Sequence, residues 1–208
     1  MSEILFYHAP NTRSAGVRVL LEELEAPHEL KILNMKAGEQ RQPPYLGINP
    51  MGKVPAILHR GVLITEQVAI YLYLADLFHE AGLAPALGDP DRGPYLRWLV
   101  YYGSCFEPAV VDLAMKREPA PLAMCPYGDY DTMLKTLVDR LSAGPYVLGD
   151  RFSAADLLWA GALTWTTGFK LVPELPAITD YIARVTRRPA FGKIKALDAE
   201  LAAAQQPA

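Results

Sequence analysis

The dipeptide Val54-Pro55 is the first feature that could bind a ligand. It opens an apolar run that continues to His59 and is predicted to be a strand. Proline cannot donate a hydrogen bond to a sheet, so Pro55 must lie at the start or the edge of a strand. If the Val54–Pro55 bond is cis, the amide and carbonyl of Val54 turn outward, where they can pair with an extended, peptide-like ligand. Only about 5–6% of such bonds are cis, so a trans proline at a strand edge stays open as the alternative.

The two cysteines, Cys105 and Cys125, are the next candidates, because thiolates bind metals and form disulfides. They form no Cys-x-x-Cys pair and have no neighbouring histidine. This pattern predicts neither a zinc site nor a disulfide framework. We therefore expect no metal, and two small buried thiols in a reducing compartment.

The composition is that of a globular protein with one large or two small domains: 208 residues, 51% of them hydrophobic and 21% charged. Twenty basic and 23 acidic residues argue against a nucleic-acid partner, because phosphate binding needs a cationic excess. The N-terminus lacks the pattern of a secretory signal, and no apolar run reaches the length of a membrane span. We expect a cytoplasmic protein that does not cross a membrane.

The elements that must position Val54 and Pro55 follow from the hydrophobic pattern of the first 79 residues. Short apolar runs predict strands, and apolar positions at helical spacing predict an amphipathic helix from Ser14. A second helix begins at Glu66. This order predicts an α/β domain over residues 1–79. Its predicted strands cover residues 4–7, 28–34, 54–59 and 62–64.

Strand signals end after this domain. Residues 80–90 are rich in proline, glycine and acidic residues, which is typical of an exposed linker. The remainder, residues 91–208, is predicted to be an all-α domain. Its predicted helices cover residues 92–116, 128–141, 153–167, 175–186 and 190–201.

Three stretches, residues 49–57, 66–72 and 149–156, resemble the glutathione S-transferase family, of bacterial type. The likeness covers essentially the whole chain and implies a thioredoxin-like domain followed by an all-α helical domain. In the third stretch, Ser153 and Asp156 are spaced as a capping box that stabilises a helix start. Phe152 and Leu157 are placed to form the hydrophobic staple of the same helix.

The resemblance implies that glutathione is the co-substrate and assigns residues to its two ends. Glu66 neutralises the ammonium of the γ-glutamyl end, and amides at a helix N-terminus take its carboxylate. Gln67 stands where the family usually has serine, although its amide still donates. Lys53 supplies a cation for the glycyl carboxylate. Taken alone, these charged residues also fit solvated surface positions. The residues assigned to glutathione are Gln40, Arg41, Lys53, Val54, Pro55, Glu66 and Gln67.

Catalysis in this family activates the glutathione thiol, whose pKa of about 8.5 leaves little thiolate at pH 7. A donor to the sulfur is expected in the loop after the first strand, at the N-terminus of the first helix. Asn11 is the first candidate because its amide donates without titrating. Thr12 and Ser14 offer hydroxyls and come next, and Tyr7 follows. This loop has no cysteine, which argues against mixed-disulfide chemistry.

The resemblance thus implies a detoxification enzyme, a glutathione transferase that conjugates the thiol to small apolar electrophiles. Tyr102 and Phe106 are the predicted contacts of the electrophile. Two alternatives stay open on the same scaffold: a glutathione-dependent isomerase, dehalogenase or peroxidase, and a non-catalytic glutathione-binding protein. The family also implies a symmetric homodimer.

Overall fold

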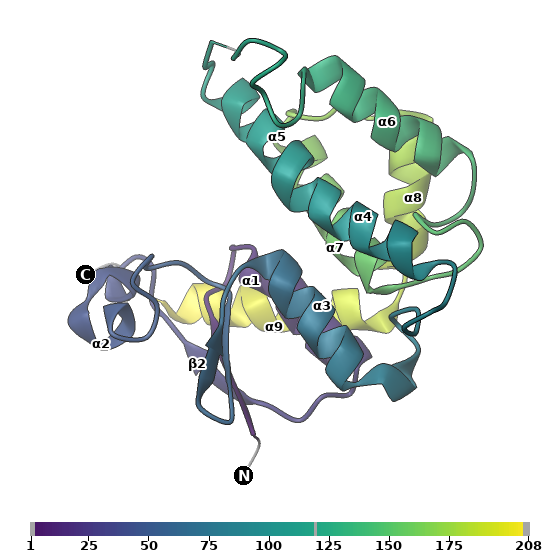
Figure 1. Cartoon of the computed structure of the whole chain (residues 1–208). Coiled ribbons are helices and arrows are strands. Elements are labelled where there is room, and N and C mark those ends of the chain that lie inside the picture. Colours follow the sequence, from purple (N-terminus) through teal and green to yellow (C-terminus); the bar gives the residue numbers. More distant parts are fainter. Residues whose placement is uncertain (1–2, 119, 206–208) are drawn as a thin grey trace. The chain divides into compact units, whose positions relative to one another are not determined.

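The computed structural model describes residues 3–118 and 120–205. The chain forms two compact units (Figure 1). The first unit consists of residues 1–81 and 188–208, and the second of residues 82–187.

The described part of the first unit contains a four-stranded sheet with the strand order β2-β1-β3-β4. β1 is parallel to β2, with His8 opposite Ile32, and antiparallel to β3, with Tyr7 opposite Ala56. β3 and β4 form a hairpin. The predicted strands are confirmed, with bounds β1 Ile4–His8, β2 Glu29–Ile32, β3 Ala56–His59 and β4 Val62–Ile64.

These strand directions bring several loops to one end of the sheet. β1, β2 and β4 all finish at this end, whereas the antiparallel strand β3 begins there. The segments that meet at this end, here called the loop end, are therefore the ones after β1, after β2, before β3 and after β4. They contain every residue that the sequence assigned to glutathione and, apart from Tyr7 within β1, every candidate thiol donor.

Helices of the first unit pack on one another through close backbone contacts. α1 packs against both α3 and α9. The Tyr71 hydroxyl of α3 donates to the Gly16 carbonyl of α1 at 2.7 Å. A Cβ at Gly16 would lie 2.9 Å from that hydroxyl oxygen, so a larger residue would displace the Tyr71 side chain. The helical elements are α1 Ser14–Glu23, η1 Glu39–Arg41, α2 Pro43–Leu46, α3 Gln67–Leu77, η2 His79–Ala81 and α9 Pro189–Ala204.

The structure divides the chain differently from the predicted domains 1–79 and 91–208. α9 belongs to the first unit, where Arg188 forms an ion pair with Glu23 of α1. The segment predicted as an exposed linker is largely part of the second unit: Leu83 is buried and its carbonyl accepts the Ala154 amide at 2.8 Å. An amphipathic pattern reveals a buried face, but it does not reveal which neighbour covers that face.

The second unit is helical throughout its regular elements, around a core that includes Tyr95, Trp159 and Tyr181. The predicted helix over residues 92–116 is interrupted by a π turn, η3. Pro108 explains this turn, because it lacks the amide that would bond to the Ser104 carbonyl. The elements are α4 Arg92–Tyr101, η3 Tyr102–Phe106, α5 Glu107–Ala114, α6 Tyr130–Ser142, α7 Ala154–Gly168 and α8 Pro176–Thr186.

Among the described residues, no helix combines the length and apolar character needed to cross a bilayer.

The predicted capping box at the start of α7 is confirmed. The Asp156 carboxylate accepts the Ser153 amide and the Val147 amide, each at 2.9 Å. It also accepts the Tyr181 hydroxyl at 2.9 Å. Burial raises the pKa of Asp156 to about 6, although these hydrogen bonds favour the ionised form.

The raised pKa predicts a pH-dependent stability. Between the unfolded pKa of 3.8 and the folded value of about 6, the unfolded chain releases the Asp156 proton first. The free energy of unfolding should therefore fall by about 3 kcal/mol as the pH rises through this window, and then level off. Urea unfolding of the wild type and of Asp156→Asn from pH 4 to pH 7 isolates this component. Parallel pH profiles for the two proteins would contradict the prediction.

Candidate active site

The segment of residues 9–14, here called the thiol loop, connects β1 to α1 and is held from inside by Ser14. The Ser14 side chain is fully buried, and its hydroxyl lies 2.8 Å from the His8 Nδ1 and 2.7 Å from the Thr12 hydroxyl. It accepts the Ala9 amide at 3.1 Å, and the Thr12 hydroxyl donates to the Ala9 carbonyl at 2.8 Å. Ser14 thus faces the protein interior, so its predicted role as thiol donor does not fit its position.

A second set of buried contacts continues from His8 to α9. The His8 Nε2 lies 3.1 Å from Asp198 Oδ1, and the Arg18 guanidinium donates to the same oxygen. Burial alone raises the pKa of the Asp198 carboxyl. The interactions with His8, and then those with Arg18, outweigh this effect and hold that pKa below its ordinary value. Asp198 is therefore an ionised acceptor within the first unit.

Asn11 lies at the tip of the thiol loop with an exposed side chain and a φ of 58°. Asparagine tolerates this left-handed region better than most residues. Thr12 is half-buried, with its hydroxyl turned toward Ala9 and Ser14. Of the four predicted donors, Asn11 is the one whose side chain is exposed at the loop end.

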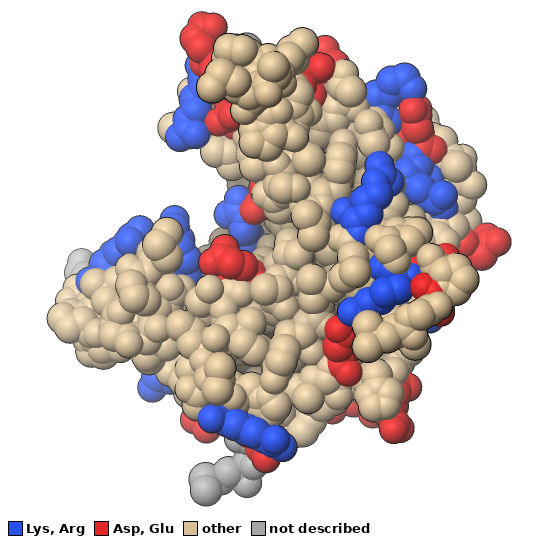
Figure 2. All heavy atoms as spheres, viewed as in Figure 1, with Lys and Arg blue, Asp and Glu red and all other residues tan. Residues whose placement is uncertain are grey.

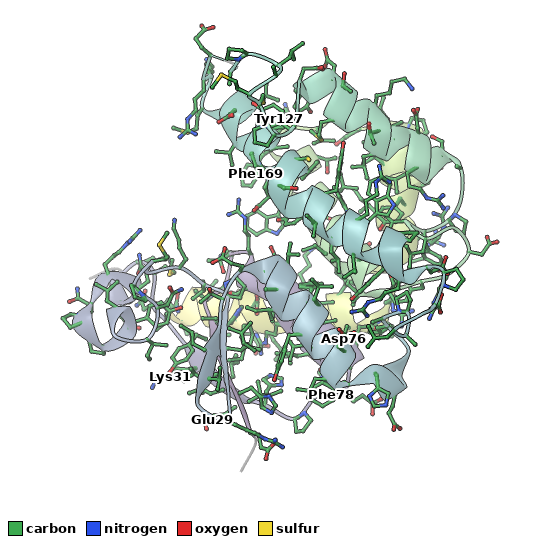
Figure 3. All side chains as sticks on the ribbon, viewed as in Figure 1. Glu29, Lys31, Asp76, Phe78, Tyr127 and Phe169 are labelled. Carbon is green, nitrogen blue, oxygen red and sulfur yellow. The ribbon has the colours of Figure 1, made fainter. Side chains whose placement is uncertain are left out.

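Tyr7 points to the opposite face of the sheet from His8, because side chains alternate along a strand. It packs in a cluster with Leu33, Tyr45 and Ala56. Burial, and then the charge of Glu29 on β2 (Figure 3), raises the pKa of the Tyr7 phenol. Tyr7 is thus a core residue that stays protonated at neutral pH.

The Val54–Pro55 peptide bond is cis, as the sequence suggested. The preceding carbonyl, that of Lys53, is anchored by two donors: the buried Tyr45 hydroxyl at 2.5 Å and the Asn49 amide at 2.9 Å. No described residue hydrogen-bonds to the amide or carbonyl of Val54. The strand start is thus rigid, while the backbone groups of Val54 are available to a ligand.

Gln40, Arg41 and Lys53, three of the residues assigned to glutathione, lie together around Gly52. Gly52, with a φ of 57°, fits so tightly that a Cβ there would lie 2.7 Å from the Gln40 carbonyl oxygen and 3.0 Å from Arg41. The Arg41 guanidinium also donates to the Met51 carbonyl at 3.3 Å. The side chains of Arg41 and Lys53 are exposed. Figure 2 shows Lys and Arg side chains gathered over the end of the unit that carries α2.

Glu66 and Gln67 mark the start of α3 at the loop end. Glu66 is exposed and has a φ of 62° with a ψ of 116°, an unfavourable conformation for a residue with a Cβ. The Gln67 amide donates to the Arg13 carbonyl at 3.2 Å. Gln67 therefore ties the start of α3 to the start of α1, a contact that the sequence did not reveal.

The two aromatic residues predicted to contact the electrophile are core residues of the second unit. Tyr102 and Phe106 are 4% and 1% exposed, and both pack against Trp159. The exposed aromatics of that unit include Trp165 and Phe169, which pack together with ring centres 5.7 Å apart. Phe169 is labelled in Figure 3. Helical spacing alone did not distinguish these two kinds of position.

Comparison with known proteins agrees with this fold. The model of the glutathione S-transferase N-terminal domain matches residues 1–76, and the model of the C-terminal domain matches residues 108–189. The chain therefore belongs to the glutathione S-transferase family, and its architecture is a thioredoxin-like unit plus a helical unit.

Relatives in plants and bacteria resemble it over most of their length. A glutathione S-transferase of Hyoscyamus muticus is 27% identical over 89% of this chain and 95% of its own. The disulfide-bond oxidoreductase YfcG of Escherichia coli is 27% identical over 90% and 92%. A sphingomonad glutathione S-transferase, solved in complex with glutathione, has a TM-score of 0.77 at 29% identity, covering 94% and 98% of the two chains. The chain is accordingly a glutathione transferase enzyme.

The fit of Gly52 against Gln40 gives a test of this part of the site. Gly52→Ala should destabilise the protein and weaken glutathione binding, because the added Cβ forces the backbone of η1 to move. Gly38→Ala is the matched control, since Gly38 also has a positive φ, 72°, but has nothing within 4 Å of an added Cβ. Urea unfolding should show a loss of about 1–2 kcal/mol for Gly38→Ala and a larger one for Gly52→Ala. Equal losses would mean that the contact with Gln40 has no consequence.

Proposed function

We propose that this enzyme conjugates the thiol of glutathione to small apolar electrophiles, with the tripeptide bound along the loop end of the first unit. The proposal depends mainly on the backbone of Val54. Its amide and carbonyl form no hydrogen bond with described residues, although the preceding Lys53 carbonyl is held by two donors. An extended peptide that pairs with Val54 adds a short strand-like contact. This is the recognition that a tripeptide substrate requires.

The charges at the loop end match the two ends of glutathione. Lys53 and Arg41 offer cations to the glycyl carboxylate on one side of Val54. Glu66 offers a carboxylate to the ammonium of the γ-glutamyl end, next to the N-terminal amides of α3. Unfavourable backbone conformations, such as that of Glu66, concentrate at ligand sites. This conformation supports the view that Glu66 binds a ligand and is not only the first residue of a helix.

The chemical step is the attack of the glutathione sulfur on an electrophilic carbon. The thiol first loses its proton to solvent, and the resulting thiolate forms the new carbon–sulfur bond while a leaving group departs or a double bond accepts the electron pair. The Asn11 amide donates to the thiolate and so favours ionisation. Lowering the thiol pKa by about two units requires about 2.7 kcal/mol, which is within reach of such a donor and a helix N-terminus.

An apolar substrate is supported by the exposed aromatic pair of the second unit. Trp165 and Phe169 are 42% and 64% exposed, and their rings are tilted against each other at an interplanar angle of 35°. Such a surface favours contact with a flat apolar molecule. The homodimer stays a prediction, supported by the exposed apolar residues Tyr73 and Leu77 on α3.

A second candidate is the reduction of disulfides by glutathione, which is favoured by the likeness to YfcG. Product analysis separates the two activities. Conjugation consumes one glutathione and yields a thioether, whereas disulfide reduction converts two glutathione molecules to glutathione disulfide. Glutathione disulfide formed from an added disulfide substrate, with no conjugate formed on a separate panel of apolar electrophiles, would favour this second candidate.

Glu66 provides a test of glutathione binding. Glu66→Ala should weaken binding at least tenfold, because it leaves the ligand ammonium without its counter-ion. Glu25→Ala is the matched control: Glu25 is exposed and has a φ of 48°, but it lies at the other end of α1. Calorimetry should show a larger dissociation constant for Glu66→Ala and an unchanged one for Glu25→Ala. An unchanged constant would leave Glu66 as a helix-start residue.

The role of Asn11 is tested through the pKa of the bound thiol. Asn11→Ala and Asn11→Gly should both raise that pKa toward its solution value and lower kcat, while glutathione affinity changes by only a few-fold. Glycine tolerates the φ of 58°, so it separates loss of the amide from backbone strain. The thiolate absorbance followed against pH gives the result. A wild-type value in Asn11→Gly would show that another group activates the thiol.

A further inference from the structure

The buried contacts behind the thiol loop form a continuous chain of polar groups from α9 to the loop. Asp198 on α9 contacts His8 at the end of β1, His8 contacts Ser14, and Ser14 contacts Thr12. The His8 side chain is fully buried. The matched C-terminal family domain ends at residue 189, so it does not include Asp198.

The proton positions in this chain follow from the chemistry of Asp198. An ionised carboxylate only accepts hydrogen bonds, so the His8 Nε2 must carry a proton and donate it. Arg18 already balances the charge of Asp198, so the assignment of a single proton to the imidazole, on Nε2, leaves the buried group without net charge. In that tautomer the His8 Nδ1 is an acceptor, and its partner at 2.8 Å is the Ser14 hydroxyl.

The same accounting determines what Ser14 and Thr12 do. The Ser14 proton has two acceptors within reach, the His8 Nδ1 at 2.8 Å and the Ala9 carbonyl at 3.0 Å. We assign it to the nearer one, His8, while the Ser14 oxygen accepts the Ala9 amide. The Thr12 hydroxyl lies 2.8 Å from the Ala9 carbonyl oxygen and 2.7 Å from the Ser14 oxygen, and with the Ser14 proton on His8 both of these oxygens are acceptors for the Thr12 proton. The Thr12 proton is thereby directed into the loop. A bound sulfur is left with the amide of Asn11 and the backbone amides as donors.

We propose that Asp198 and His8 are positioning residues for thiol activation: Asp198 selects the His8 tautomer that holds Ser14, and Ser14 holds the thiol loop in the conformation that presents Asn11. Neither residue touches the substrate. The predicted effect on the thiol rests on the proposed function. The predicted His8 tautomer does not, because it is a property of the protein without ligand.

The tautomer is measured first, by nitrogen NMR of the imidazoles in the unliganded wild-type protein. The expected result is an unprotonated His8 Nδ1 and a protonated Nε2. In Asp198→Asn the neutral side-chain amide no longer requires that arrangement, so the signal should move toward a mixture. A protonated Nδ1 in the wild type, or an unchanged signal in Asp198→Asn, would overturn the proposal without any reference to glutathione.

The effect on the thiol is measured with His8→Gln and Asp198→Asn. Both should lower kcat by about tenfold and raise the pKa of bound glutathione, while KM for glutathione changes by less than about threefold. Adding His8→Gln to Asn11→Ala should produce little further change, because both act on the same hydrogen bond. Additive effects, or an unchanged thiol pKa in both single variants, would overturn the proposal.

Glu23→Gln is the matched control, because it weakens another ion pair between α1 and the start of α9, with Arg188. It should lower the melting temperature and leave the thiol pKa unchanged. A thiol pKa shift in Glu23→Gln equal to that of Asp198→Asn would reduce Asp198 to a general stabilising residue. If the thiol pKa of glutathione bound to the wild-type protein equals its solution value, the proposed function fails. The NMR measurement of the tautomer still decides whether Asp198 controls His8.

Discussion

The direction and register of β3 against β1 are the constraint on which the site depends. Because β3 is antiparallel to β1, the start of β3 and the end of β1 lie at the same end of the sheet, with Ala56 opposite Tyr7. The segment after β4 returns to that end as well. Slipping β1 by one residue would move its side chains to the other face, and Tyr7 would then replace His8 in the buried contact with Ser14. The register therefore determines both which segments meet at the loop end and which side chain contacts Ser14 beneath it.

In the proposed function, much of the recognition at this end uses backbone groups, and side-chain contacts must hold these groups in place. Asn11 and Glu66 have positive φ angles, which cost about 1–3 kcal/mol each when a Cβ is present. The surrounding packing maintains such conformations: the buried Tyr45 and Asn49 side chains hold the Lys53 carbonyl. In this way a small hydrophobic cluster beneath the sheet edge stabilises the segment that precedes Val54.

α9 connects this support to the far end of the chain. Asp198 is buried, and a buried carboxylate is tolerated only when it is paired and hydrogen-bonded. Arg18 and His8 supply those partners from α1 and β1. Replacing the group with apolar residues could preserve stability, but it would remove the directional bonds that order the thiol loop. In the positioning role proposed for Asp198, the conformation of the thiol loop is the reason for a charged group in the core.

The sequence by itself determined the elements, and the tertiary structure decided how they combine. Periodicity and turn residues located the strands and helices, and the spacing of Ser153 and Asp156 located a cap, because these signals are local. The resemblance carried by residues 49–57 and 66–72 pointed to the loop end. Local signals could not show that Ser14 faces inward while Asn11 faces outward, or that Tyr102 and Phe106 are buried whereas Trp165 and Phe169 are exposed. They also could not place Asp198 beside His8, because that contact joins residues 190 positions apart and exists only once α9 packs against α1.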